Sequence, residues 1–303
     1  MQSGELDAAY GLPYASLPLF ENDPYTISSC ETSRSFFAQM NYAAEALQDD
    51  NVRAAIASAI DKENFTSVLL DGNGEAAVGP FPESFTFGDT TVTAETYDPV
   101  KAKELLKNAG WTDTDGDGYV DKNGQKLTIR WVTYPSRQEL PLLAESVQAT
   151  MKDIGIDIQV NSTANYQDYL DKGDWDIFAG AFVSAPTGDP EYFFTSTVVG
   201  SKNYGKYQND EVTKLTEKLH QTFDKDERGK LAVELQQEKQ MAVTFDPTER
   251  ASLATQMTQT ILDDHAFVFA SHLKMSMVSG KGVSGLVAHP SDYYEITVDL
   301  DKK

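Results

Sequence analysis

Cysteine is nearly absent from this 303-residue chain, because Cys30 is the only one. A single thiol excludes a disulfide within the chain and a zinc site built from several cysteines. A chain of this length buries a substantial core without such links, as one large domain or two ordinary ones. Cysteine usage therefore leaves the compartment open.

Positive charge and long apolar runs are scarce as well. The chain has 25 Lys and Arg against 47 Asp and Glu, a formal net charge of -22 at pH 7. This balance argues against a nucleic-acid partner, which needs a basic surface. No apolar run approaches the ~20 residues of a membrane span, and the first residues lack the features of an export signal. Either the protein is cytosolic, or the sequence begins downstream of such a signal.

Motifs that carry catalysis are also missing. The chain has no GxSxG motif and no phosphate-binding glycine loop, and no histidine neighbours Cys30 in sequence. The four histidines are His220, His265, His272 and His289. Their spacing fits no HExxH or helical pair, so we expect ordinary surface or core histidines. The sequence predicts that the protein is not an enzyme.

The most informative segment present is residues 97–129, which contains an aspartate-rich loop. Positions one, three, five and nine of a calcium-binding loop are matched by Asp113, Asp115, Asp117 and Asp121. Position twelve, where such a loop needs a bidentate carboxylate, is Gly124. Two interpretations stay open: a structural turn, or a loop that binds calcium weakly and incidentally.

The elements predicted on either side of this loop favour the turn. Asp98 and Pro99 are typical of a helix start and Gly110 of its end, while residues 127–133 alternate like a strand. Calcium-binding loops of this kind lie between two helices. A helix, a loop and a strand form a different motif.

Strands and helices alternate after the loop. A strand at 127–134, a helix at about 138–153 and a strand at 156–160 predict parallel strands in an α/β layer. A third buried strand at 175–181 leads into the turn-rich segment 184–190. Such sheets bind ligands beyond the carboxyl ends of their strands.

Apolar spacing in residues 51–60 predicts a core-facing helix before this layer. After it, residues 209–264 are helical in pattern and contain a duplication, in which 223–237 recurs as 245–259. Each copy has an aspartate and, three residues later, a glutamate, as in a helix cap. Further on we expect strands at 266–269, 275–278 and 295–298.

The order of these segments resembles the family 5 solute-binding proteins of ABC importers, the group that binds oligopeptides, dipeptides and nickel. The matches extend along nearly the whole chain. They are Ser3-Gly-Glu-Leu-Asp7, Asn51-Val-Arg-Ala-Ala-Ile56, Tyr97-Asp-Pro-Val to Ala-Gly-Trp111, Asp117-Gly, Gly188-Asp-Pro190, Phe193-Phe194, Asn203-Tyr-Gly, Glu249-Arg250 and the strand at Val268.

This resemblance implies an α/β fold: a periplasmic-binding-protein-like lobe (type II, family 5) with a mixed sheet flanked by helices, truncated at the N-terminus. Family members close two lobes around a ligand. By this mapping residues 1–24 are a remnant of the first lobe and hinge, 25–268 the second lobe and 269–303 the return to the first.

The function implied is capture of a peptide or a nickel or other metal chelate, and its delivery to a membrane permease with ATPase subunits. The protein is then an extracytoplasmic monomer, either a cell-surface lipoprotein or periplasmic, with no cofactor beyond incidental calcium. The residues alone keep one alternative open, a calcium-dependent structural or adhesion module built on the aspartate loop.

The resemblance also implies a set of ligand-binding residues. They are Arg34, Asn41, Ser184, Ala185, Thr187, Gly188, Asp189, Asn203 and Tyr204. Two family signatures are changed here. Peptide binders carry an aspartate where this chain has Pro186, and nickel binders carry a tryptophan where it has Ser184. The sequence thus predicts a cleft without naming the solute.

Overall fold

The computed structural model describes residues 1, 3–221, 247–288, 301 and 302. Within them seven strands form one sheet in the order β1-β9-β2-β8-β6-β7, and β3 also pairs with β9. The strands are β1 (Ala8–Tyr10), β2 (Thr26–Met40), β3 (Gly74–Ala76), β6 (Thr128–Thr133), β7 (Asp157–Ser162), β8 (Ile177–Val183) and β9 (Phe267–Ser279). Two small two-stranded sheets are formed by β4 (Asp121–Lys122) with β5 (Gln125–Lys126) and by β10 (Val283–Ser284) with β11 (Asp301–Lys302).

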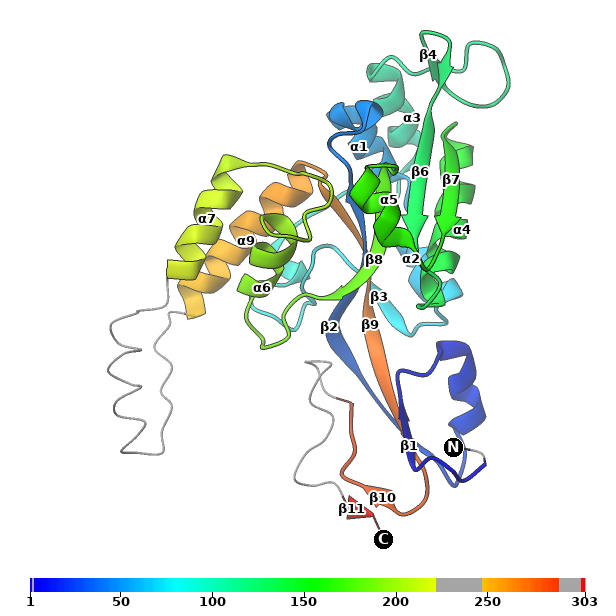
Figure 1. Ribbon diagram of the computed structural model, residues 1–303, viewed down its shortest axis with the longest axis vertical. Helices are drawn as coiled ribbons and strands as arrows, with labels where there is room; N and C mark the ends of the chain where they lie inside the picture. Colours follow the sequence, from blue (N-terminus) through cyan, green and yellow to red (C-terminus); the bar gives the residue numbers. More distant parts are fainter. Residues whose placement is uncertain (2, 222–246, 289–300, 303) are drawn as a thin grey trace.

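Helices cover the upper part of this sheet (Figure 1). They are α1 (Asp50–Ser58), α2 (Lys62–Asn64), α3 (Pro99–Asn108), α4 (Glu139–Asp153), α5 (Tyr166–Lys172), α6 (Glu191–Phe193), α7 (Asp210–Gln221) and α9 (Pro247–Asp263). Short 3-10 or π turns are η1 (Tyr14–Phe20), η2 (Glu45–Gln48), η3 (Phe65–Leu69), η4 (Asp89–Thr91) and η5 (Phe194–Val198).

The sheet is mixed, as predicted from the sequence. β6 runs parallel to both β7 and β8, and α4 connects β6 to β7. β2 pairs antiparallel with β8 and with β9. The β-α-β unit expected in residues 127–160 is confirmed, because parallel neighbours need such a crossover.

Both faces of the sheet are buried. Successive side chains of a strand point to opposite faces, so Phe36 lies in one apolar core and Phe37 in the other. The first core lies under α1, α3 and α4, and the second under α5, α7 and α9. Burial on two sides explains why β8 is apolar throughout instead of alternating.

Local sequence signals form the helix ends that were expected. The carboxylate of Asp98 accepts hydrogen bonds from the amides of Val100 and Lys101, and Pro99 occupies the first turn of α3. Gly110, just beyond the helix, has a φ of 83°. A cap of this kind contributes about 1 kcal/mol. The core-facing helix predicted at 51–60 is confirmed as α1.

β2 and β9 are much longer than the other strands and extend out of the helix-covered region (Figure 1). Their outer ends pair from Thr26–Ser279 to Glu31–Lys274, and β1 adds to the same end of β9. A third, small apolar cluster around Leu17 lies there with η1. We call the helix-covered part the upper body and this outer part the lower body.

The expectation of separate strands at 266–269 and 275–278 is wrong, because β9 runs unbroken between them. The polar residues Ser271 and His272 lie between the two predicted strands. However, His272 Nδ1 lies 2.8 Å from Ser35 Oγ, and its Nε2 lies 2.9 Å from Asp89 Oδ2. Because these polar groups are satisfied internally, the strand continues through them.

Part of the helical duplication lies outside the described residues. This applies to the first copy, 223–237, and to the first two residues of the second copy; the strand predicted at 295–298 lies outside them too. The rest of the second copy forms most of α9. Among the described helices, we find none that is long and apolar enough to span a membrane.

Candidate functional site

The carboxyl ends of β6, β7 and β8 share one edge of the sheet, since these strands are parallel. The loops that follow them cover residues 134–138, 163–165 and 184–190. β2 and β9 leave the upper body past this edge and enter the lower body. We call it the loop edge; it is where α/β sheets bind ligands.

The loop 184–190 is fixed at its start by β2. Ser184 donates to the Ser33 carbonyl from its amide at 2.8 Å and from its hydroxyl at 3.1 Å. In return the Ser33 hydroxyl donates to the Ala185 carbonyl at 3.3 Å. Ser184 and Ala185 are buried, whereas Thr187 and Gly188 are exposed. Of this predicted set, Thr187 and Gly188 form the accessible tip.

The last predicted residue of the loop points away from the tip. Oxygens of Asp189 accept hydrogen bonds from Nε and Nη2 of Arg250 at 2.8 and 2.5 Å. Arg250 belongs to α9 and is buried. The Asp189 carboxylate is therefore engaged inside the protein.

Two arginines lie beside the loop edge. Arg34 is opposite Val183 in the β2–β8 ladder, and Arg137 lies in the loop after β6. Tyr134 lies close enough to both arginines to feel their charges. Burial raises the pKa of its phenol, and the charges of Arg137 and Arg34 act against that rise. Both side chains are half-buried. The edge can thus hold a ligand that carries carboxylates.

Tyrosines extend this surface. The ring of Tyr134 lies 4.8 Å from that of Tyr166, and its hydroxyl accepts a hydrogen bond from the Ala181 amide at 3.0 Å. Arg137 also lines a cavity of about 20 Å³ with Tyr14 of the lower body. The sequence did not single out Tyr134 or Arg137, although Tyr134 ends a predicted parallel strand and Arg137 lies in the loop after it.

Asn41, Asn203 and Tyr204 lie elsewhere. Asn41 follows β2 at the amino end of β8, where its side chain donates to the Trp175 carbonyl at 2.8 Å. Seven residues of extended strand, about 23 Å, separate it from Arg34. The structure therefore does not bring Asn41 together with the loop 184–190, because the two ends of one strand cannot meet.

Asn203 and Tyr204 are engaged within the upper body. The Asn203 amide donates to the Tyr207 carbonyl at 2.7 Å and accepts from the Tyr207 amide at 3.0 Å, which closes a turn. The Tyr204 ring packs edge-on against Phe178 at 5.9 Å. Both side chains are thus engaged in packing and in a turn of the upper body.

A cavity of about 500 Å³ lies at the amino end of β6, lined by Trp111, Lys122 and Arg130 among others. Its charged groups are already engaged. Arg130 forms ion pairs with Asp174 at 2.5 Å and Asp176 at 2.7 Å. Lys122 donates to a backbone carbonyl at 2.7 Å. The loop edge is the better candidate site, because Arg137 lines a cavity there together with Tyr14 of the lower body.

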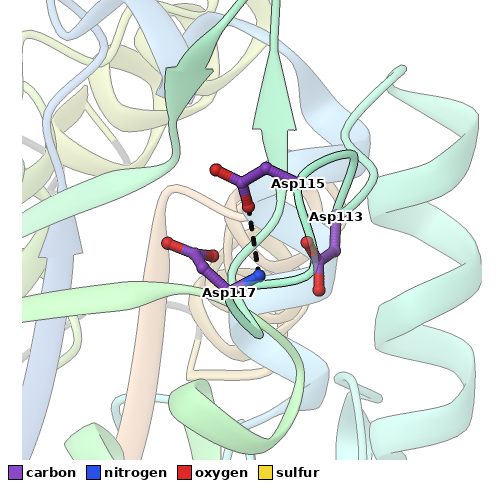
Figure 2. A group of neighbouring side chains, drawn as sticks. All are labelled: Asp113, Asp115 and Asp117. Atoms are coloured by element: carbon purple, nitrogen blue, oxygen red, sulfur yellow. Dashed lines mark hydrogen bonds between the residues drawn. The ribbon is translucent and has the colours of Figure 1, made fainter.

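The aspartate loop folds on itself. Figure 2 shows Asp113, Asp115 and Asp117 around one turn, and one ligand atom of each lies within 4.8 Å of the others. The same carboxylates accept hydrogen bonds from amides within the loop. Asp113 accepts from the amides of Gly116 and Gly118, and Asp115 accepts from the amide of Asp117 at 3.1 Å.

The remaining positions of this loop do not complete a calcium site. Asp121, position nine, accepts hydrogen bonds from the amide and hydroxyl of Thr114 at 2.9 and 2.7 Å. Lys126 forms an ion pair with Asp117 at 2.7 Å. Gly124, position twelve, lies in the turn of the β4–β5 hairpin. The geometry is that of a structural turn.

A serine, a histidine and an aspartate are hydrogen-bonded in series in the upper body, but they are inaccessible. Ser35 is 0% and His272 2% exposed. Nucleophilic catalysis requires a serine that a substrate can reach. This buried series joins β2, β9 and η4, and its role is structural.

Comparison with known proteins follows this geometry. A family model described as bacterial extracellular solute-binding proteins, family 5 Middle, matches residues 1–205. The oligopeptide-binding protein AppA of Bacillus subtilis is 29% identical over 264 residues, which are 84% of this chain and 45% of AppA. The nickel-binding protein NikA of Staphylococcus aureus is 30% identical over 182 residues, 59% of this chain and 35% of NikA.

Solved structures agree in fold. The structure of AppA in complex with a nonapeptide has a TM-score of 0.79 at 22% identity and covers 100% of this chain and 57% of its own. That of S. aureus NikA with Ni(L-His)2 has a TM-score of 0.78 at 21% identity, with 100% and 58% covered. The predicted fold class is confirmed.

This chain spans about half the length, or less, of the relatives that it matches. AppA and NikA are named for oligopeptide and nickel binding, which gives the calcium-dependent alternative no support. The family model covers more than half of this chain in one stretch. The chain therefore belongs to the bacterial extracellular solute-binding proteins of family 5.

Proposed function

We propose that this protein is the substrate-binding component of an ABC import system that captures a peptide or a nickel chelate. The observation that carries the proposal is the loop edge, which lies where two long strands pass from one body to the other. A ligand bound there touches both bodies. Rotation about β2 and β9 then opens and closes the site, a hinge motion typical of such binders.

Arg34, Arg137 and Thr187 are the side chains that we assign to ligand contact. Guanidinium groups bind carboxylates through paired hydrogen bonds, and half-burial strengthens them. A peptide carries a terminal carboxylate, and an amino-acid chelate of nickel carries carboxylates around the metal. Both solute classes therefore fit the same edge.

The remaining features of the proposal follow from family membership. We place the second lobe at residues 25–268, with 1–24 and 269–303 in the first. The protein works outside the cytoplasm as a monomer, in the periplasm or as a surface lipoprotein. It binds its solute without chemical change and passes it to a membrane permease with ATPase subunits.

Ligand retention tests the proposal. The protein is purified under native conditions at the full length at which its own cells make it and is then denatured. The released molecules are identified by tandem mass spectrometry with elemental analysis for nickel. We expect one equivalent of a peptide or of a nickel chelate. Release of a solute without any carboxylate contradicts the proposal.

Arginine variants locate the site. Arg34→Gln and Arg137→Gln should each weaken retention about 10- to 100-fold, since a hydrogen bond to a charged group is worth about 1.5 to 3 kcal/mol. Arg130→Gln is the control, because this arginine lies at the amino end of β6. Equal loss in all three variants, at equal melting temperature, places the ligand elsewhere.

A further inference from the structure

The Asp189–Arg250 pair joins the loop 184–190 to a helix that lies behind it. Arg250 is 2% exposed and Asp189 24% exposed, and two hydrogen bonds at 2.8 and 2.5 Å connect them. Paired contacts of this kind fix direction as well as distance, because the guanidinium is planar. The pair therefore holds the carboxyl end of the loop in one orientation.

The same guanidinium has further partners. Its Nη1 donates to the Leu219 carbonyl of α7 at 2.7 Å, and its Nη2 to Glu191 at 3.1 Å. Glu191 in turn lies 2.6 Å from His220 Nδ1. One buried side chain of α9 thus joins α7, the start of α6 and the loop.

Gly188 shows why the loop needs such support. Its φ is 78°, a conformation that glycine adopts easily, and its amide donates to the Ala185 carbonyl at 3.0 Å. No atom lies within 4 Å of where a Cβ would stand, so neighbouring side chains do not hold this tip. Its geometry depends on the two anchors, Ser33 at the start and Arg250 at the end.

We propose that Arg250 is a positioning residue for the ligand-binding loop. It fixes the conformation of residues 186–188 through Asp189, and it removes the Asp189 carboxylate from the set of groups that can contact ligand. The inference rests on the proposed function, in which this loop borders the ligand. Its consequence for specificity is that the loop offers no carboxylate to an amino group of the solute.

Hydrogen exchange of the 303-residue chain, without ligand, tests the positioning role. In Arg250→Lys and Arg250→Gln we expect the amides of Gly188 and Glu191 to exchange at least about tenfold faster, because local opening becomes easier. Lysine keeps the charge but lacks the planar fork. The conservative variant should therefore fail as well.

Arg53→Lys is the matched control. Arg53 is 7% exposed and donates to the carbonyls of Leu47 at 2.8 Å and Asp264 at 3.1 Å, away from the loop. All three variants should melt lower, on the order of 10 °C where a buried pair is broken. If the loop amides exchange no faster in the Arg250 variants than in Arg53→Lys, Arg250 has a general structural role and the proposal is wrong.

An apolar double variant separates Asp189 from the other partners of Arg250. Buried ion pairs can often be replaced by apolar side chains of similar size. We expect the Gly188 amide to exchange more slowly in Asp189→Leu with Arg250→Met than in Arg250→Met alone. Gly188 is the readout here, because the Glu191 amide donates to Asp189 Oδ1 at 2.9 Å and loses this acceptor in the double variant. Equal exchange in both would show that Asp189 is not the route. Because no ligand is present, this outcome does not depend on whether the transport proposal holds.

Discussion

At the scale of single residues, Glu31 is a half-buried carboxylate whose pKa is perturbed. Its Oε1 is buried and has no hydrogen-bond partner among the described residues. Burial raises the pKa of this carboxyl, and the nearby charge of Glu75 raises it further. A raised pKa means that Glu31 stabilises the fold below its ordinary pKa and that this stability is lost as the pH rises through the folded value.

We predict that Glu31→Gln raises the melting temperature at pH 7 by about 1 to 2 °C, the scale of a single substitution at a half-buried site. The gain should vanish near pH 4, where the wild-type carboxyl is protonated. Glu145→Gln, at an exposed site on α4, is the control and should change little. Thermal melts at the two pH values decide; a gain that is the same at both contradicts the assignment.

Lys62 gives the opposite pH dependence. Its Nζ donates to the Ala77 carbonyl at 3.0 Å, and burial lowers its pKa to about 8. Between pH 8 and 10.5 the unfolded chain binds more protons at this residue than the folded protein, so stability rises with pH.

The comparison with Lys62→Met isolates this effect, since the tyrosines titrate alike in both proteins. We expect the unfolding free energy of the wild type minus that of the variant to increase by on the order of 2 kcal/mol from pH 7.5 to 9.5. Urea titrations at both pH values measure it. A constant difference would mean that Lys62 titrates normally.

Which residues meet was harder to predict than which elements form. The Asp98 cap depends on amides two and three residues away, so the local sequence was enough. The Asp189–Arg250 pair joins residues 61 apart, and nothing local marks it. Asn41 was placed in the cleft by resemblance, but only the register of β2 with β8 shows that it lies at the far end.

At the scale of elements, the same distinction separates β6 from β9. Apolar residues and flanking turns define β6, so its existence followed from the sequence. β9 was predicted as two strands, and the polar partners of His272 between them, Ser35 and Asp89, come from distant segments. Element prediction failed where tertiary hydrogen bonds override local polarity.

The β4–β5 hairpin and the aspartate loop before it form one element, in which the ammonium group of Lys126 pairs with an aspartate of the loop. Hydrogen bonding from Lys126 lowers the pKa of the Asp117 carboxyl, which keeps the pair ionised. An incoming calcium ion must displace this ammonium, and it finds no carboxylate at Gly124. Calcium binding should therefore be weak.

We predict that 1 mM calcium changes the melting temperature by less than about 2 °C. A dissociation constant of 1 mM or more gives at most about 0.4 kcal/mol at this concentration. Magnesium at the same concentration controls for ionic strength. A rise above about 5 °C with calcium alone would show a site that the geometry does not predict.

At the scale of the whole molecule, the upper and lower bodies share two long strands, and Tyr14 of the lower body packs both against the first core and against the small cluster around Leu17. AppA and NikA are both longer than this chain, which matches 45% of AppA and 35% of NikA. We expect a ligand at the loop edge of the 303-residue chain to be only partly buried. A ligand that is only partly buried gains too few contacts to offset the translational and rotational entropy that it loses on binding.

We therefore predict weak binding by the 303-residue chain itself. Isothermal titration with a nonapeptide and with Ni(L-His)2 should give dissociation constants above about 10 μM, equivalent to less than about 7 kcal/mol. Titration of the Arg137→Gln variant shows how much of the measured binding heat comes from ligand bound at the loop edge. A nanomolar constant for either probe would contradict the need for closure between two bodies.

The paired strands β2 and β9 have a consequence for how a membrane partner acts. Any protein that grips both bodies and favours one angle between them alters solute affinity by some factor. By thermodynamic reciprocity, bound solute alters the affinity for that protein by the same factor. A partner that recognises the solute-bound form must therefore act on the angle that β2 and β9 set between the two bodies. Stable binding of that partner to the open form is then sufficient to release the solute.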